Sequence, residues 1–125
     1  MAAQAGSQVL LFDIQAGAAE QARTALQTTW NKLEKKGKIA PGQSERWASQ
    51  LQVTAALGDL APCRLVVEAV VEKLELKRSL FADLEGIVAE DAVLVTNTSS
   101  LSVTAIAAHL RRPERFAGYH FFNPV

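Results

Sequence analysis

The groups in this sequence best suited to proton transfer are a histidine and a run of hydroxyl and amide side chains. His120 lies within the aromatic run at residues 119–122, and because imidazole exchanges protons near neutral pH, it could act as a general base. Residues 97–100 offer one amide and three hydroxyls, which could bind a substrate oxygen or a ribose. Spacing alone favours simpler roles: His120 as a hydrogen-bonded core residue, and residues 97–100 as a strand-to-helix loop with surplus capping groups.

Three carboxylates stand beside apolar runs. Asp13 closes the first run, where a dinucleotide-binding fold uses an acid to accept hydrogen bonds from the adenosine ribose and to disfavour NADP. An N-cap or turn aspartate is equally consistent with that position. Glu68 and Glu72 flank a later run and could share a proton. Spacing favours the interpretation that one of them caps the next helix, with Lys73 and Lys77 near enough to neutralise them.

Alternating strand and helix patterns are expected to position these groups. Apolar runs typical of buried parallel strands occur at residues 8–13, 65–70, 92–97 and 116–122, with a weaker one at 53–57. Helices are predicted at residues 17–36, with Leu26 and Trp30 on the apolar face, and at residues 41–51. A third helix is predicted from the spacing of Leu76, Leu80, Leu84 and Ile87. A fourth is predicted to begin at the N-cap Ser102 and to carry Val103, Ile106 and Leu110. This order predicts a Rossmann-like, doubly wound parallel α/β fold, whose ligands lie at the carboxyl ends of the strands.

The composition is that of a globular domain with balanced charge. The chain has 125 residues, 49% of them hydrophobic, and its thirteen basic side chains equal its thirteen acidic ones. Zero net charge argues against nucleic acid or a membrane as the main partner. Cys63 is the single cysteine, which excludes an intrachain disulfide and favours a cytoplasmic location. Two histidines without cysteine pairs give no support for a metal site.

A glycine-rich phosphate cradle is not found among the seven glycines. No two of them have the one-residue spacing of the dinucleotide fingerprint. Gly37 and Gly42 have the outer spacing of a P-loop, but glutamine and serine follow where lysine and serine would be required. The long helix ends in four lysines, Lys32, Lys35, Lys36 and Lys38. These are interpreted as solvated cations that suit the helix dipole, with a phosphate-binding patch as the alternative.

Three stretches, at residues 66–72, 97–101 and 115–125, together resemble the 3-hydroxyacyl-CoA dehydrogenase family in order and spacing. The resemblance covers essentially the whole chain, and its last stretch, RFAGYHFFNPV, is highly specific. It implies NAD-dependent oxidation of a 3-hydroxyacyl-CoA to the 3-oxoacyl-CoA, by hydride transfer to NAD. The implied cofactor is NAD and the implied substrate is a 3-hydroxyacyl-CoA of fatty acid metabolism.

The resemblance also implies roles for individual residues. His120 matches the general base that takes the 3-hydroxyl proton, Ser99 the hydroxyl that holds the 3-oxygen, and Asn123 the amide beside nicotinamide and substrate. The residues that match cofactor-binding positions are Asp13, Ala69, Glu72, Lys77, Ser99 and Asn123. Thr29 and Lys36 fall where the family contacts the CoA moiety.

Compared with the family, residues 1–125 are expected to form a partial NAD-binding domain. The family pattern has a strand and a glycine-rich loop ahead of residue 1, a glutamate that orients the histidine beyond residue 125, and a C-terminal helical domain. Without these parts we expect open sheet edges and no turnover by this chain alone. Two alternatives are a non-catalytic fragment that self-associates through exposed sheet edges and a weak nucleotide-binding module that acts through Asp13.

Overall fold

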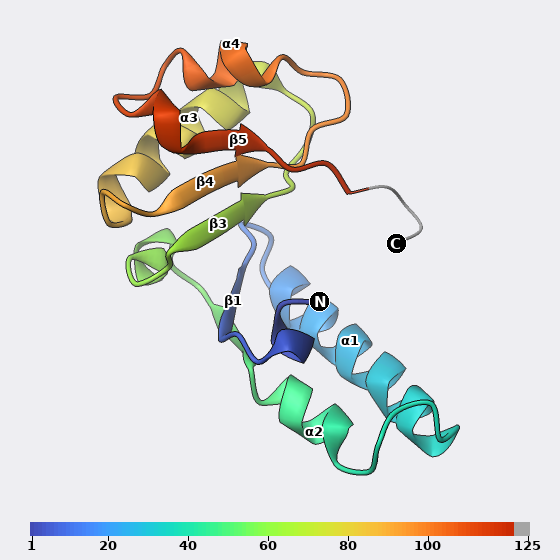
Figure 1. Cartoon of the computed structure of the whole chain (residues 1–125). Helices are drawn as coiled ribbons and strands as arrows, with labels where there is room; N and C mark the ends of the chain where they lie inside the picture. The colour runs from blue at the N-terminus through green and yellow to red at the C-terminus, as the bar shows by residue number, and fades with distance from the viewer. Residues whose placement is uncertain (122–125) are drawn as a thin grey trace. The chain divides into compact units, whose positions relative to one another are not determined.

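The computed structural model describes residues 1–121 and divides the chain into two compact units (Figure 1). Unit 1 is Met1–Asp59 and unit 2 is Leu60–Val125. Unit 1 holds a two-stranded parallel sheet and unit 2 a three-stranded parallel sheet. Parallel strands that alternate with helices confirm the predicted α/β class.

Unit 1 is a strand–helix–strand crossover with a short second helix. Its elements in chain order are the 3-10 turn η1 (Ala3–Ala5), β1 (Val9–Phe12), α1 (Ala18–Lys35), α2 (Gln43–Ala48) and β2 (Leu51–Thr54). Val9 lies opposite Leu51 in the parallel ladder. The core forms around Trp30, which is 5% exposed and meets the Trp47 ring edge to face.

Three expectations for unit 1 need correction. The helix predicted at residues 41–51 ends at Ala48, because Leu51 is buried in the core and begins β2. The weak strand predicted at residues 53–57 therefore begins at Leu51. Leu26, predicted on the apolar face of α1, is 40% exposed, so the buried face of α1 is centred on Trp30.

A carboxylate from α1 caps α2. The two carboxylate oxygens of Glu34 accept hydrogen bonds from the backbone N–H groups of Gly42 and Ser44, each at 2.9 Å. These bonds lower the pKa of Glu34 below its ordinary value. Gly42 has a φ of 82°, which glycine adopts without the strain a side chain would add. The turn at Gly42 thus joins α1 to α2 and lets Glu34 cap α2.

Unit 2 packs both of its helices on one face of its sheet (Figure 1). The 3-10 turn η2 (Leu57–Leu60) leads into unit 2. The elements of unit 2 in chain order are β3 (Leu65–Glu68), α3 (Leu74–Ile87), β4 (Val93–Thr96), α4 (Val103–Ala107), the 3-10 turn η3 (Pro113–Arg115) and β5 (Phe116–Gly118). The ring of Phe81 in α3 meets that of Phe116 in β5 at a centroid distance of 4.6 Å. A Cβ on Gly118 would lie 2.9 Å from Cγ2 of Val103, so a glycine lets α4 approach β5.

Several apolar side chains on the opposite face of the unit 2 sheet are exposed. Leu65, Val67 and Val93 are 54%, 45% and 41% exposed. The strand order is β3–β4–β5, and β1 pairs only with β2, so within residues 1–121 one edge of β1 and one edge of β3 carry no strand. The predicted open sheet edges are therefore present. The single sheet that the sequence predicted is divided into two.

Several elements of unit 2 are shorter than predicted. β5 ends at Gly118, so His120 lies in the loop after the strand. α4 ends at Ala107, and Leu110 lies beyond it. Ser102 caps α4 as predicted, because its side chain accepts a hydrogen bond from the N–H of Ala105 at 3.2 Å. In the part of the chain that the structure describes, no helix is both long and apolar enough to span a bilayer.

Candidate active site

Most of the predicted site residues in unit 2 lie at the carboxyl end of its sheet. Ala69 and Glu72 follow β3, Ser99 follows β4, and His120 follows β5. The three strands are parallel neighbours, so the three loops share one edge of the sheet. This is the edge where parallel α/β sheets bind their ligands.

A buried ion pair joins α3 to β3 behind these loops. Nζ of Lys77 lies 2.7 Å and 3.0 Å from the two carboxylate oxygens of Glu68, and their side chains are 0% and 1% exposed. The same carboxylate accepts hydrogen bonds from Oγ1 of Thr96 at 2.6 Å and from the N–H of Val70 at 2.5 Å. With donors on both oxygens, the burial of this charge is compensated within the protein.

The ion pair confirms that Lys77 neutralises Glu68, and the contacts of α3 correct two other sequence-based interpretations. Neither glutamate caps α3, because Glu68 accepts hydrogen bonds from Val70, Lys77 and Thr96, and Glu72 accepts them from Thr98 and Ser99. The buried face of α3 includes Lys77 and Phe81, whereas Leu76, predicted on that face, is 38% exposed. Lys77 also lies 3.7 Å from Oε2 of Glu72, so its charge reaches the loops of the site through that carboxylate.

Glu72 connects the loop after β3 to the loop after β4. Its Oε1 accepts hydrogen bonds from the N–H of Ser99 at 2.8 Å and from Oγ of Ser99 at 3.3 Å. Oγ1 of Thr98 donates to the same carboxylate, 2.8 Å from Oε2. The hydrogen bond from the Ser99 N–H makes the largest contribution to a lowered pKa of Glu72, and the hydrogen bond from Thr98 makes the second largest. Partial burial acts in the opposite direction. Glu72 is therefore an ionised acceptor at neutral pH that holds Ser99 in place.

His120 lies on a backbone segment that is anchored on both sides. The N–H of Tyr119 donates to the carbonyl of Thr96 at 2.9 Å, and the N–H of Phe121 donates to Oδ1 of Asn97 at 3.0 Å. The rings of Tyr119 and Phe121 contact each other at a centroid distance of 4.5 Å. His120 itself is exposed, so the interpretation of a core histidine is wrong. Its position at the sheet edge is fixed by its two neighbours.

The predicted residues of unit 1 are exposed. Asp13 follows β1, and its Oδ1 accepts a hydrogen bond from the N–H of Gln15 at 2.8 Å, which is a local turn contact. Lys36 is the C-cap residue of α1. Oγ1 of Thr29 donates to the carbonyl of Ala25 at 2.9 Å, within the helix. Of the remaining predicted site residues, Asn123 lies outside the described residues.

Two buried threonines belong to the site: sequence reasoning identified Thr98 only as one of the hydroxyls at residues 97–100, and it did not single out Thr96. Thr96 and Thr98 are 0% and 8% exposed, and each donates to a glutamate. Thr96 continues the two-residue alternation of Leu94, which is 0% exposed, so its burial follows from the strand pattern, whereas Thr98 lies beyond the end of β4. The sequence offers no comparable signal for the partners, which come from β3 and the loop that follows it.

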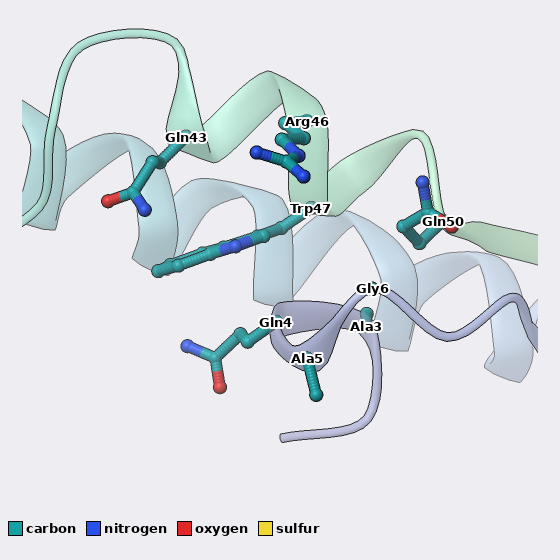
Figure 2. A pocket seen from close by; sticks show the side chains of 8 residues that line it. All are labelled: Ala3, Gln4, Ala5, Gly6, Gln43, Arg46, Trp47 and Gln50. Carbon is teal, nitrogen blue, oxygen red and sulfur yellow. The ribbon is translucent and has the colours of Figure 1, made fainter.

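Two surface pockets of the described residues lie elsewhere. One, of about 200 Å³, lies between η1 and α2. Figure 2 shows the residues that line it, Ala3, Gln4, Ala5, Gly6, Gln43, Arg46, Trp47 and Gln50. A second, of about 190 Å³, lies at Glu85, Glu90, Arg111, Arg112 and Arg115. None of the predicted site residues lines either pocket.

Comparison with known proteins gives the family. The family model described as 3-hydroxyacyl-CoA dehydrogenase, NAD binding domain, matches residues 1–125. The chain belongs to this family. Among curated relatives, the 3-hydroxyadipyl-CoA dehydrogenase of Escherichia coli K12 is 44% identical over 125 residues, which are all of this chain and 26% of that protein. A fatty acid oxidation complex subunit alpha from Psychrobacter cryohalolentis is 37% identical over 99% of this chain and 17% of its own length.

Solved structures give the same result for this member of the 3-hydroxyacyl-CoA dehydrogenase family. The 3-hydroxybutyryl-CoA dehydrogenase of Escherichia coli K12 superposes with a TM-score of 0.95 at 44% identity, over 98% of this chain and 26% of that one. FadB2 of Mycobacterium tuberculosis gives a TM-score of 0.92 at 36% identity, over 99% of this chain and 44% of that one. The chain thus spans about a quarter of the curated relative from Escherichia coli, and the matched part is an NAD-binding domain.

Proposed function

We propose that this chain supplies the cofactor-binding and proton-transfer groups of an NAD-dependent 3-hydroxyacyl-CoA dehydrogenase. The reaction is oxidation of the 3-hydroxyl to a 3-oxo group, with NAD reduced to NADH and one proton released. The observation that carries the proposal is the arrangement of Ser99, held by Glu72, on the loop next to the one that carries His120. A hydroxyl and an imidazole on neighbouring loops suit a substrate alcohol that must be oriented and deprotonated.

Each side chain then has a defined task. His120 takes the proton from the 3-hydroxyl, while Ser99 and Asn123 hydrogen-bond the 3-oxygen and keep C3 oriented. Ala69 and Glu72 line the nicotinamide end of the cofactor site, whereas Lys77, whose side chain is wholly buried, contributes its charge only through Glu72. NAD, when bound there, would accept the hydride from C3. An ionised Glu72 suits this end of the site because it can accept hydrogen bonds from ribose hydroxyls.

The fit of NAD at the adenosine end depends on Asp13. It is exposed at the carboxyl end of β1, where an acid accepts hydrogen bonds from the ribose hydroxyls. Oδ1 of Asp13 accepts a hydrogen bond from the N–H of Gln15, which orients the carboxylate and leaves Oδ2 for a ribose hydroxyl. The same charge repels the 2′-phosphate of NADP, so we propose that the site prefers NAD.

Isothermal titration with NAD and with NADP tests this function. Asp13→Asn is expected to weaken NAD binding roughly 10- to 100-fold, the effect of a lost hydrogen bond to a charged group, and to narrow the preference for NAD over NADP. Glu20→Gln is the matched control, because Glu20 is an exposed acid in α1 of the same unit. Wild-type protein that binds neither nucleotide would contradict the proposal, as would equal losses in both variants.

The substrate class is proposed from the relatives. They are named for 3-hydroxyadipyl-CoA and 3-hydroxybutyryl-CoA, and others belong to fatty acid oxidation complexes. We therefore propose a 3-hydroxyacyl-CoA as substrate, with Thr29 and Lys36 as contacts to its CoA moiety. Both side chains are exposed on α1, or at its end, as such contacts require. The single cysteine, Cys63, agrees with a proposed cytoplasmic location.

A second candidate function, self-association, is favoured by the exposed apolar face of the unit 2 sheet. Val67 lies on β3, which has one edge without a strand among the described residues. Val67→Lys is expected to lower the average mass measured by sedimentation at high concentration, because a lysine discourages pairing of strands from two chains. Leu76→Lys is the matched control, because it adds the same charge on α3, away from this face of the sheet. A wild-type mass that equals one chain at all concentrations would rule self-association out.

A further inference from the structure

We infer that Thr98 is a positioning residue, which fixes Ser99 by joining Glu72 to the start of the loop after β4. The inference rests on the proposed function, because Ser99 is its proposed substrate-binding hydroxyl. Thr98 has no proposed contact with substrate or cofactor and acts through its two neighbours.

The Thr98 hydroxyl uses both its donor and its acceptor capacity. Its proton is shared by the two oxygens of Glu72, at 2.8 Å and 3.0 Å, and Oγ1 accepts a hydrogen bond from the N–H of Leu101 at 3.0 Å. The side chain is only 8% exposed, so water competes little for these bonds. One buried hydroxyl thus ties the loop after β3 to the turn at residues 98–101.

Ser99 depends on this arrangement for its orientation. Its N–H is held by Glu72 at 2.8 Å, whereas its Oγ lies 3.3 Å from the same oxygen. The shorter bond fixes the backbone and the longer one leaves the hydroxyl able to turn toward a substrate oxygen. The Glu72 side chain is 37% exposed, so without Thr98 it could turn into solvent and release the Ser99 N–H.

The titration of Glu72 reports the contact independently of any ligand. The bond from Thr98 is the second-largest cause of the lowered pKa of Glu72, after the bond from the Ser99 N–H. Removing the hydroxyl should therefore raise the pKa of Glu72 toward its ordinary value. The direction follows because the bond stabilises the ionised carboxylate and has no equivalent in the protonated form.

The test compares three variants of the full chain. Thr98→Val keeps the shape and removes the hydroxyl, and Thr98→Ser keeps the hydroxyl. Ser102→Ala removes a different hydroxyl nearby, the N-cap of α4, which does not contact Glu72. Carbon-13 NMR of the side-chain carboxyl gives the titration of Glu72, nitrogen-15 spectra give the environment of the Ser99 N–H, and calorimetry gives the affinity for NAD.

Thr98→Val is expected to raise the Glu72 titration midpoint, shift the Ser99 N–H signal, and weaken NAD binding about tenfold, as loss of a hydrogen bond to a charged group would. Thr98→Ser and Ser102→Ala should stay within about twofold of the wild type in NAD affinity. If Thr98→Val leaves the Glu72 titration unchanged, or Thr98→Ser does as much harm as Thr98→Val, the inference is wrong. If wild-type protein binds no NAD, the proposed function fails, and the two NMR measurements still decide whether Thr98 holds Glu72 and Ser99.

Discussion

Lys77→Met is expected to lower the free energy of unfolding by about 3–5 kcal/mol, the cost of leaving a buried charge without its partner. Lys77 is wholly buried, and its ammonium is the only cation within hydrogen-bond distance of Glu68 among the described residues. Methionine fills a similar volume, so the loss reports the charge rather than a cavity. Urea unfolding of the full chain, followed by circular dichroism, measures the change.

A double-mutant cycle separates the ion pair from general damage to the core. Glu68→Gln combined with Lys77→Met removes both charges and keeps an amide oxygen that can accept from Val70 or Thr96. The double variant is expected to recover most of the stability lost in Lys77→Met, because replacing a buried ion pair by neutral groups is often close to neutral. A double variant as unstable as the sum of the two single ones would show that Glu68 and Lys77 do not interact.

The order of the elements could be predicted from the sequence because each depends on local patterns. Apolar runs located β1, β3, β4 and β5, the weaker run at residues 53–57 overlapped only the end of β2, and the Ser102 cap located the start of α4. Ends of elements were less accurate where tertiary contacts decide them. Leu51 was assigned to a helix because its spacing from Trp47 is helical, but its burial in the core of unit 1 places it in β2. Local propensity is a weak guide where burial favours another conformation.

The place of the candidate site residues in the fold could be predicted, but the contacts among them could not. The rule that ligands bind at the carboxyl ends of parallel strands, with the family resemblance, gave Glu72, Ser99 and His120. Lys77 was predicted as a neutralising partner from its closeness in sequence, but Thr96 was not, because it lies 28 residues from Glu68 and meets it only through the β3–β4 register. Sequence spacing favoured a helix cap for Glu68. The burial of Lys77 could be recognised only once the structure showed which face of α3 is buried.

In a protein that also carries the remaining parts of the family pattern, His120→Gln is expected to reduce kcat for NADH formation from a 3-hydroxyacyl-CoA by about 10²- to 10⁴-fold, the usual contribution of a general base. The affinity for NAD should stay within about twofold, because the proposed role of His120 is proton transfer and not cofactor binding. The loop should keep its shape, since the bonds of Tyr119 and Phe121 that anchor it are made by backbone N–H groups. Stopped-flow absorbance of NADH and calorimetry with NAD measure the two quantities.

His109→Gln provides the matched control for that prediction. His109 is exposed just beyond the C-terminal end of α4, the end opposite the Ser102 cap. It lies in the same unit as His120 and receives the same substitution. Because glutamine can hydrogen-bond but cannot act as a base near neutral pH, a loss specific to His120→Gln identifies proton transfer. If both variants lose the same activity, or if His120→Gln loses NAD affinity in proportion to kcat, then His120 supports the structure of the site and another group accepts the proton.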